Sequence, residues 1–147
     1  PIACGGTDTR WPKCSVAFLD IDHFGSYNHL HGDSQGDLVL KSVAQTIRGV
    51  ARKDDLVFRK GGEELVVVLP DASHDEAQAV AERIRSAVEA LRIPHTGSQT
   101  ASVVTVTVGI ASAKSDRAVT VQQLMDMAAD MAMRAKVLSA RNRVHVA

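Results

Sequence analysis

The sequence has few aromatic residues and no excess of charge of either sign. Aromatic residues make up 3% of the 147 positions, which disfavours an RNA-recognition sheet because such sheets stack bases on aromatic side chains. Lysine and arginine together number 17, and so do aspartate and glutamate. Neither a broad basic surface for nucleic acid nor a polybasic membrane patch is therefore expected, and an anionic ligand would have to be held by a local group of residues.

Cysteines and long apolar runs are also scarce. Cys4 and Cys14 are too few and too close together at one end of the chain to indicate a disulfide framework. Neither a secretory signal nor an apolar run long enough to cross a bilayer is visible. A reducing, cytoplasmic setting is the default expectation, with a tether to the membrane through a missing N-terminal region as the alternative.

The hydrophobic content, 45% of the residues, suits one globular domain whose core is large enough for folding without disulfides or structural metal ions. The chain opens on Pro1 without a methionine, and residues 1–13 have the composition of a loop. We therefore expect residues 1–13 to be a linker or a truncated N-terminal segment and residues 14–147 to form the domain. A sensory or regulatory domain would then be missing from this chain.

Apolar periodicity predicts an alternation of strands and helices. Strands are expected at 14–20, 56–58, 65–69, 102–111 and 143–147, and helices at 40–50, 73–91 and 120–135. The helix after Ser73 begins with the Ser-x-x-Glu spacing of a capping box and cannot continue through Pro94. In the last helix, the residues expected to face inward are Leu124, Met127, Ala128, Met131 and Ala135.

This order of elements predicts an α+β fold. Strand, helix, strand, strand, helix, strand is the order of a ferredoxin-like βαββαβ core, here with an added C-terminal helix and strand. The strands would form an antiparallel central sheet flanked by helices, as in nucleotidyl cyclases and polymerase palms. Because unrelated functions share this architecture, the fold alone does not decide what the chain does.

A tight turn with two acids lies between two apolar runs, at Gly61-Gly62-Glu63-Glu64. Paired glycines allow positive φ and let a large ligand approach the backbone. Adjacent carboxylates repel each other unless a cation or hydrogen-bond donors hold them. A divalent metal would supply that cation, whereas the alternative is a solvent-exposed turn with charged residues.

Two further acids, Asp20 and Asp22, end the first predicted strand. Positions two apart in a regular strand share a face. In a ferredoxin-like sheet the first strand and the hairpin are central neighbours, so Asp20 and Glu63 are expected to bind one magnesium ion through oxygen ligands. Such a site suits phosphates. The alternative is that Asp20 or Asp22 caps the following loop.

Several motifs occur together in an order that is similar to one family. They are Leu19 to Phe24 (LDIDHF), Asn28, Gly36-Asp37, Arg59 to Leu65 (RKGGEEL), Thr107 to Ala111 (TVGIA), Ala129-Asp130 and Arg141 to Val144 (RNRV). Together they resemble the GGDEF family of diguanylate cyclases, in a variant whose signature reads Gly-Gly-Glu-Glu-Leu. The resemblance spans about Val16 to Val146, and it rests on the ordered spacing of the motifs.

The resemblance implies an enzyme that joins two GTP molecules into cyclic di-GMP and releases pyrophosphate. Each domain of a transient homodimer would present one nucleotide to the other, so one chain would be half an active site. A 3′-hydroxyl would attack the α-phosphorus of the facing GTP, helped by alignment and by neutralisation of charge by the metal. The product, cyclic di-GMP, would also act as a feedback inhibitor.

The resemblance also assigns the metal and catalytic groups. The Asp20 carboxylate, the Ile21 carbonyl and the Glu63 carboxylate would hold Mg²⁺, with Mn²⁺ as an alternative ion. Asp20 and Glu63 would therefore be catalytic residues, and Glu63 would also assist deprotonation of the attacking hydroxyl. Glu64 would be a second metal ligand or would orient its neighbour, and the supporting role is preferred.

Contacts to the nucleotide follow from the same resemblance. Asn28 and Asp37 would read the guanine edge, because aspartate accepts from the guanine N1 and N2 protons while the asparagine amide complements the remaining edge. Backbone amides around His23 and Phe24 would meet the phosphates, aided by the close approach that Gly62 permits.

The segment Arg52-Lys53-Asp54-Asp55 resembles the family's inhibitory product site. Arginine can grip phosphate or stack on guanine, and aspartate can accept from a guanine edge. Cyclic di-GMP bound to Arg52 and Asp55 would restrain the domains from outside the active site. The alternative is an exposed charged turn after a helix.

Two positions depart from the family pattern where a lysine is usual. Gly25 follows the phenylalanine of the first motif, and Val137 lies four residues before Arg141. Lys136 is the neighbour of Val137, and one residue rotates a helix position by about 100°, so its reach toward the phosphates is left open. Lys136 and Arg141 are taken as substrate contacts.

Loss of two cations that contact the phosphates would reduce stabilisation of the transition state and leave metal and guanine recognition intact. A second function therefore stays open, a catalytically weak or inactive domain that binds GTP or cyclic di-GMP as a regulatory module. Zinc binding by His23, His29 and His31 is a further alternative, because His-x-His spacing can serve zinc. A polymerase palm is considered last, since nothing indicates a basic groove.

Overall fold

The computed structural model describes residues 13–113 and 119–147. In chain order its elements are β1 (Cys14–Ile21), α1 (Phe24–His31), α2 (Asp33–Val50), β2 (Leu56–Gly61), β3 (Glu64–Pro70), α3 (His74–Ala90), β4 (Val106–Ser112), α4 (Val121–Val137) and β5 (Val144–Val146). The expectations for Cys4 and for the loop character of residues 1–12 lie outside the described residues. The domain boundary after residue 13 therefore stays a prediction.

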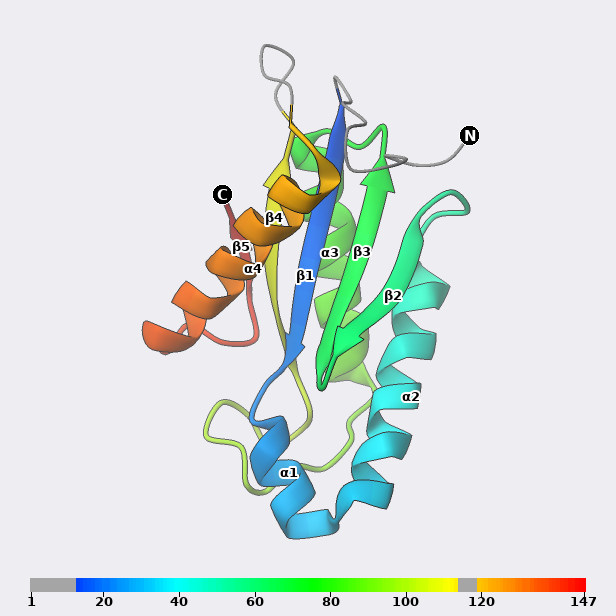
Figure 1. The fold of residues 1–147 in the computed structure, drawn as a ribbon. Coiled ribbons are helices and arrows are strands. Elements are labelled where there is room, and N and C mark those ends of the chain that lie inside the picture. The colour runs from blue at the N-terminus through cyan, green and yellow to red at the C-terminus, as the bar shows by residue number, and fades with distance from the viewer. Residues whose placement is uncertain (1–12, 114–118) are drawn as a thin grey trace.

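Five strands form one sheet in the order β2-β3-β1-β4-β5. β3 is antiparallel to both β1 and β2, and β1 is antiparallel to β4, whereas β5 pairs in parallel with β4. The first four strands thus have the arrangement of a ferredoxin-like core, and α4 with β5 is the added C-terminal pair (Figure 1). The α+β fold predicted from the order of elements is confirmed.

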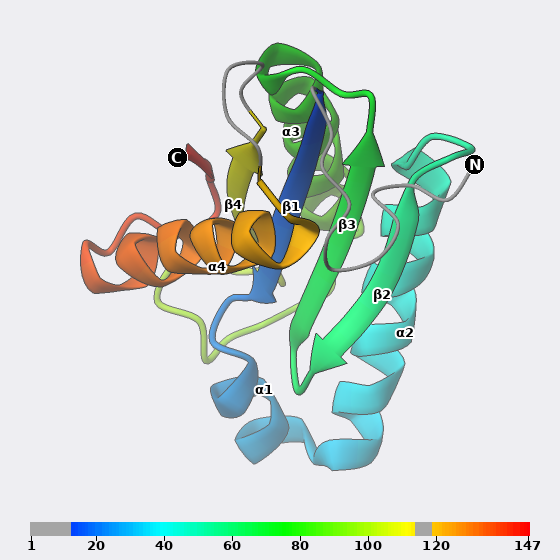
Figure 2. The ribbon, with the colours of Figure 1, turned by 45° about the horizontal axis from the view of Figure 1, so that its top comes forward.

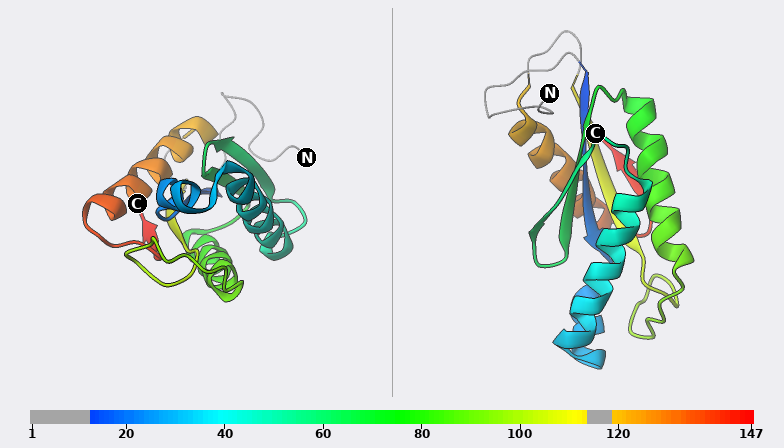
Figure 3. Two further views of the ribbon diagram at one scale, coloured as in Figure 1. Left: turned by 90° about the horizontal axis from the view of Figure 1, so that it is seen from below. Right: turned by 90° about the vertical axis from the view of Figure 1, so that its right-hand side faces the viewer.

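Helices cover both faces of the sheet, with α2 and α3 on one face and α4 on the other (Figure 3). Alternation along β1 sends Ala17, Leu19 and Ile21 to the α2 and α3 face, and Val16 and Phe18 to the α4 face. All eight residues of β1 are buried, so Asp20 near its end is held by a strand in the centre of the sheet. None of the helices in the described ranges is long and apolar enough to cross a membrane.

The helix α4 lies directly on β1 and β4 (Figure 2). Its buried residues are small apart from one leucine: Leu124, Ala128, Ala132 and Ala135. Met127 was expected to face inward, but this residue is 44% exposed, because it lies about 100° around the helix from Ala128. The close packing leaves no space for a long side chain on this face, and it brings the C-terminal end of α4 beside the end of β1.

The sequence analysis did not predict α1. This helix contains glycine, serine, asparagine and two histidines, which are weak helix formers, and it buries only Phe24 and Tyr27. Two buried residues do not make an apolar stripe, so helical periodicity became visible only from Leu40 onward. The structure corrects the start of the second helix to Asp33.

The strand predicted at 102–111 is shorter at its beginning. β4 starts at Val106, and the carbonyl of Thr105 accepts the N–H of Asp22 at 2.9 Å just beyond the end of β1. The preceding residues instead form a single antiparallel bridge between Pro94 and Val103. Residues read as strand from their valine and threonine content therefore form part of the connection from α3.

Candidate active site

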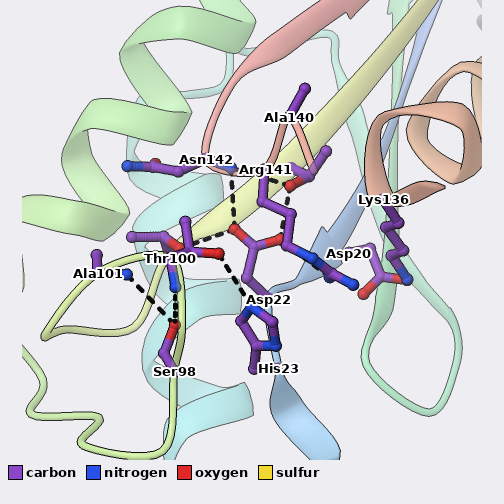
Figure 4. A network of polar contacts seen from close by, with 12 residues as sticks. Asp20, Asp22, His23, Ser98, Thr100, Ala101, Lys136, Ala140, Arg141 and Asn142 are labelled. Atoms are coloured by element: carbon purple, nitrogen blue, oxygen red, sulfur yellow. Dashed lines mark hydrogen bonds and ion pairs between the residues drawn. The ribbon is translucent and has the colours of Figure 1, made fainter. Parts of the chain in front are cut away.

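Asp20 ends β1 in a buried position next to the hairpin. Its Cα pairs with Glu64 of β3 and with Thr107 of β4, and the residue is 4% exposed. The Lys136 ammonium lies 2.5 Å from Asp20 Oδ2 (Figure 4). Burial raises the pKa of Asp20 to about 6, although Lys136 opposes the shift. The charges of Glu63 and Glu64 add to the increase, so acids from two distant segments lie close enough to interact.

The hairpin turn places Glu63 beside the end of β1. Gly61 pairs with Glu64, so Gly62 and Glu63 form the turn, and the φ of 51° at Gly62 lies in the region that favours glycine. The carbonyl oxygen of Glu63 accepts the N–H of Ile21 at 3.3 Å. The predicted hairpin is confirmed, and its acidic turn is hydrogen-bonded to the strand that carries Asp20.

Oxygen atoms suited to a divalent cation are available here. Within residues 13–113 and 119–147 no three His, Cys, Asp or Glu side chains group as a metal site, so a cation would rest on the carboxylates of Asp20 and Glu63 and on main-chain oxygen such as that of Ile21. Mg²⁺ commonly binds through one or two carboxylates together with water and substrate phosphates. The residues present therefore fit such an ion, and the burial of Asp20 close to the charges of Glu63 and Glu64 favours a cation there.

The histidines considered for zinc do not converge. His23 Nε2 lies 2.9 Å from Thr100 Oγ1, and the His31 ring packs against Tyr27 with 4.5 Å between ring centroids. His29 and His31 are two positions apart on α1, where side chains do not face each other. The zinc alternative is therefore wrong for these residues.

Asp22 is fully buried and joins three segments (Figure 4). Its carboxylate accepts hydrogen bonds from Thr105 Oγ1 at 2.7 Å, from Thr107 Oγ1 at 2.6 Å and from the N–H of Asn142 at 3.1 Å, and Arg141 Nη1 lies 3.8 Å away. These bonds tie the end of β1 to β4 and to the segment before β5. Asp22 thus holds the site together and does not cap the loop that follows it.

A basic cavity of about 450 Å³ opens beside this network. It is lined by His23, Gln99, Thr100, Lys136, Ser139, Arg141 and Arg143. Lys136 therefore reaches the site, which the sequence left open, whereas Val137 is 79% exposed. The cavity is thus lined by three positively charged side chains, Lys136, Arg141 and Arg143, although Gly25 and Val137 replace two lysines that are usual in the family. This weakens the alternative of an inactive domain, which depended on the loss of cations that contact the phosphates.

The phosphate turn expected at His23 and Phe24 begins α1. His23 adopts the left-handed region with φ 53°, and no side chain of the described residues caps α1. The side chain of Phe24 is buried and anchors the first turn. Burial lowers the pKa of His23, and the positive charge of Arg141 lowers it further, which favours the neutral ring whose Nε2 lies against Thr100 Oγ1.

Asn28 lies on α1 with a buried side-chain oxygen, Oδ1, that has no hydrogen-bond partner among the described residues. A Cβ at Gly36 of α2 would overlap that oxygen, so the glycine makes room for the amide. Asp37 follows Gly36, is exposed, and lines a cavity of about 400 Å³ between α2 and the hairpin strands. The Asp37 carboxylate at this cavity suits a ligand with N–H donors, as a guanine edge has.

Arg52 and Asp55 form a bidentate pair in the loop after α2. Arg52 Nη2 lies 2.9 Å and Nε 3.1 Å from Asp55 Oδ1, and Nη2 also donates to the carbonyl of Pro70 at 3.0 Å. The Asp55 side chain is fully buried, whereas that of Arg52 is 37% exposed. Arg52 is thus oriented by its neighbours with part of its guanidinium at the surface, and the product site stays a prediction.

Several residues of the site were missed from the sequence. They are Thr105, Thr107 and Asn142 around Asp22, and His95, Gln99 and Thr100 in the connection before β4. The Thr-x-Thr spacing at 105 and 107 puts both hydroxyls on one face and could have been read as a pair of donors. His95 and Thr100 carry no such pattern, and only the folded chain brings them to His23.

The fold and this site define a class, an α+β domain of the nucleotidyl cyclase type in which acids of a strand and a hairpin adjoin a basic cavity. Residues 8–143 match the family described as diguanylate cyclase, GGDEF domain. The chain belongs to this family, and the resemblance read from the motifs is confirmed.

Known relatives agree with this assignment. Diguanylate cyclase A of Treponema denticola is 40% identical over 102 residues, which cover 69% of this chain and 27% of that protein. The GGDEF domain of DgcB from Caulobacter crescentus, solved in complex with c-di-GMP, has a TM-score of 0.78 at 28% identity over 91% of this chain and 77% of that chain. The GGDEF domain of YfiN from Pseudomonas aeruginosa has a TM-score of 0.77 at 34% identity, with 92% and 82% covered. This chain spans well under two thirds of the curated relative.

Proposed function

We propose that this domain is a diguanylate cyclase that condenses two GTP molecules into cyclic di-GMP with release of pyrophosphate. Besides family membership, one arrangement carries the proposal. Buried Asp20 and the Glu63 turn adjoin a cavity lined by Lys136, Arg141 and Arg143, and Lys136 joins the two parts. Carboxylates for a metal next to cations for phosphates are what phosphoryl-group transfer requires.

In this mechanism Asp20, Glu63 and the Ile21 carbonyl would hold Mg²⁺ or Mn²⁺, which would neutralise charge on the reacting phosphate. Lys136 would then exchange its contact with Asp20 for the phosphates, because the Asp20 charge would be compensated. Glu63 would assist loss of the proton from the attacking 3′-hydroxyl, and Glu64 would orient its neighbour. Arg141 and Arg143 would take the remaining phosphate charge.

Selectivity for guanine would come from Asn28 and Asp37. The Asp37 carboxylate would accept from the N1 and N2 protons of guanine, and the Asn28 amide would pair with the remaining polar edge. An adenine presents a different pattern of donors and acceptors, so ATP would leave both side chains unpaired. The exposed Asp37 carboxylate at the cavity beside α2 and the Asn28 side chain packed against the neighbouring Gly36 support this assignment.

The reaction would need two copies of the chain, because each would bind one nucleotide and present it to the other. Cyclic di-GMP would act as inhibitor at Arg52 and Asp55. A sensory or regulatory domain elsewhere in a longer protein would control the meeting of the two copies.

Chromatography of the products tests this function. The chain is incubated with GTP and Mg²⁺, and in parallel with Mn²⁺ or a chelator, over a range of protein concentrations. Cyclic di-GMP should form only with a divalent ion, and the specific activity should rise with protein concentration, as a dimer of half-sites requires. Replacing the metal ligand in Glu63→Gln should abolish turnover, whereas Asp126→Asn on the exposed face of α4 should not.

Failure would be informative. If GTP binds but no cyclic di-GMP forms at any concentration, the domain is a nucleotide-binding regulatory module and the catalytic proposal is wrong. If neither GTP nor cyclic di-GMP binds in calorimetry, both functions are excluded.

A further inference from the structure

The connection between α3 and β4 carries a buried histidine that the proposed mechanism does not use. His95 is 1% exposed, and its N–H donates to the carbonyl of Ser102 at 2.9 Å. Its ring packs edge-on against Tyr27 of α1, with 5.2 Å between ring centroids. A phenyl ring would pack there equally well, so the polar atoms of this residue need another explanation.

One hydrogen bond ties His95 to the start of α1. His95 Nε2 lies 2.9 Å from the carbonyl oxygen of His23. Because a carbonyl oxygen can only accept, Nε2 must carry the proton. His95 Nδ1 has no partner among the described residues, so the ring acts through its Nε2–H alone.

His23 needs this support because its backbone is in an unfavourable conformation. Its φ of 53° and ψ of 37° lie in the left-handed region, which a residue with a β-carbon seldom adopts unless its surroundings hold it there. Within the part of the chain that the structure describes, no side chain caps α1. The shape of the turn that leads into this helix therefore depends on contacts from other parts of the chain.

Thr100 makes a second contact to the same residue. Its Oγ1 lies 2.9 Å from His23 Nε2, and Thr100 itself is held by Ser98, whose Oγ accepts the Thr100 N–H at 3.2 Å and the Ala101 N–H at 3.4 Å (Figure 4). Thr100 also lines the basic cavity together with His23, Lys136 and Arg141. The connection thus holds both the backbone and the side chain of His23, and it forms one wall of the cavity.

We propose that His95 and Thr100 are positioning residues for the triphosphate of the nucleotide. They hold the His23 turn, and with it the amides at the start of α1, in the shape that receives the phosphates. The inference rests on the proposed function, since it takes the ligand to be GTP. Guanine is assigned to Asn28 and Asp37 and not to the His23 turn, so a loosened turn should weaken binding of the phosphates and leave binding of the base intact.

Two substitutions at one position separate the hydrogen bond from the packing. His95→Phe keeps a ring against Tyr27 and removes the donor, whereas His95→Gln can place an amide N–H where Nε2 now lies. His74→Gln on exposed α3 is the control. Each protein is titrated by NMR with a non-hydrolysable GTP analogue plus Mg²⁺ and, separately, with guanosine, because NMR follows weak binding.

Loss of one hydrogen bond to the turn should weaken binding of the GTP analogue to His95→Phe by about tenfold. Guanosine binding should stay unchanged, and His95→Gln should recover most of the loss. A parallel loss for guanosine would mean that His95 only stabilises the fold, and equal binding of the analogue to wild type and His95→Phe would also overturn the proposal. If the wild-type chain bound no GTP analogue, the proposed function itself would fail.

Thr100 gives a second test should His95→Phe not fold. Thr100→Val keeps the shape of the side chain and removes the hydroxyl, whereas Thr100→Ser keeps the hydroxyl. The valine variant should bind the GTP analogue about threefold more weakly with guanosine binding unchanged, and the serine variant should match wild type. Identical affinities for valine and serine variants would remove Thr100 from the proposal.

Discussion

Asp20 holds a carboxylate where the fold makes a negative charge costly. The residue is 4% exposed, two further acids lie near it, and Lys136 is the cation that offsets part of the cost. A divalent ion would offset more of it, because a second positive charge would enter the same site. Ionised Asp20 therefore lowers the stability of the metal-free domain, whereas in the proposed function the same carboxylate would bind the metal ion.

The raised pKa of Asp20 predicts a pH effect on stability in metal-free buffer. Its pKa rises from 3.8 to about 6 on folding, so the folded chain takes up the proton more readily than the unfolded chain. The contribution of Asp20 to stability is thus fully present below pH 4 and is lost as pH rises through 6, by about 3 kcal/mol. Asp20→Asn should lack this loss and should gain stability relative to wild type between pH 4 and pH 7.

Urea unfolding at a series of pH values measures this difference. Asp126→Asn, an exposed acid of α4, is the control and should follow the wild-type profile. Equal pH profiles for wild type and Asp20→Asn would show that Asp20 has an ordinary pKa.

A lysine is usual in the family at the position of Gly25, and the structure has room for a side chain there. A Cβ at this position would meet no heavy atom of residues 13–113 and 119–147 within 4 Å, and the residue lies in the first turn of α1. Gly25→Ala should raise the free energy of unfolding by up to about 1 kcal/mol through helix propensity. Gly25→Lys should gain less stability, because a cation opposes the helix dipole at its N-terminus, but it should tighten GTP binding several-fold, as calorimetry can measure. Equal GTP affinities of the two variants would place position 25 outside the phosphate site.

The helix α4 and the strands below it decide where Lys136 lies. The alanines of α4 and Gly109 of β4 allow helix and strand to approach so closely that an added Cβ at Gly109 would overlap the carbonyl of Ala128 and come within 2.8 Å of the N–H nitrogen of Ala132. The overlapping atoms belong to the backbone, so a change of side-chain rotamer cannot relieve the overlap. The position of the C-terminal end of α4, and hence of the lysine, depends on this contact.

Gly109→Ala should therefore push α4 away from the sheet. We expect a loss of about 2–3 kcal/mol in the free energy of unfolding from overpacking, together with weaker GTP binding as Lys136 moves. Gly49→Ala is the matched control, because a Cβ at Gly49 in α2 would meet none of the described atoms within 4 Å. It should leave GTP binding unchanged and stabilise the chain slightly. Unaltered stability of Gly109→Ala in urea would contradict the close packing.

Over the molecule as a whole, the two regions proposed as active site and product site lie at opposite ends of β3. Glu64, which pairs with Asp20, begins this strand, and Pro70, whose carbonyl binds Arg52, ends it. Six residues of strand separate them by about 20 Å. Cyclic di-GMP at Arg52 would thus act from outside the active site, by restraining how two copies of the domain meet.

Product inhibition tests this separation. Arg52→Ala should relieve inhibition by cyclic di-GMP at least tenfold, since a phosphate-binding guanidinium is lost, while turnover at low product stays close to wild type. Lys53→Ala, which removes the adjacent cation, should leave inhibition unchanged. If cyclic di-GMP inhibited Arg52→Ala at the same concentration as wild type, the inhibitory product would bind in the active site and not at Arg52.

Local patterns were sufficient for most elements. The capping box at Ser73 forms as expected, with the Glu76 N–H donating to Ser73 Oγ at 3.2 Å, and the glycine turn forms the predicted hairpin. Helix α1 was missed because its only buried residues are Phe24 and Tyr27, and burial against other elements outweighs weak helix propensity. The rotation of Met127 away from the core was missed because a stripe of alanines gives little periodic contrast.

The sequence by itself determined the family, the order of the strands and of all helices but α1, and the residues proposed to bind metal, phosphate and guanine, because each of these depends on short motifs and local periodicity. Only the tertiary structure decided that Lys136 reaches Asp20, that Asp22 joins three segments, and that His95 and Thr100 hold His23. These contacts join residues more than 70 positions apart, and their geometry depends on how closely helices pack on the sheet, which no local pattern specifies.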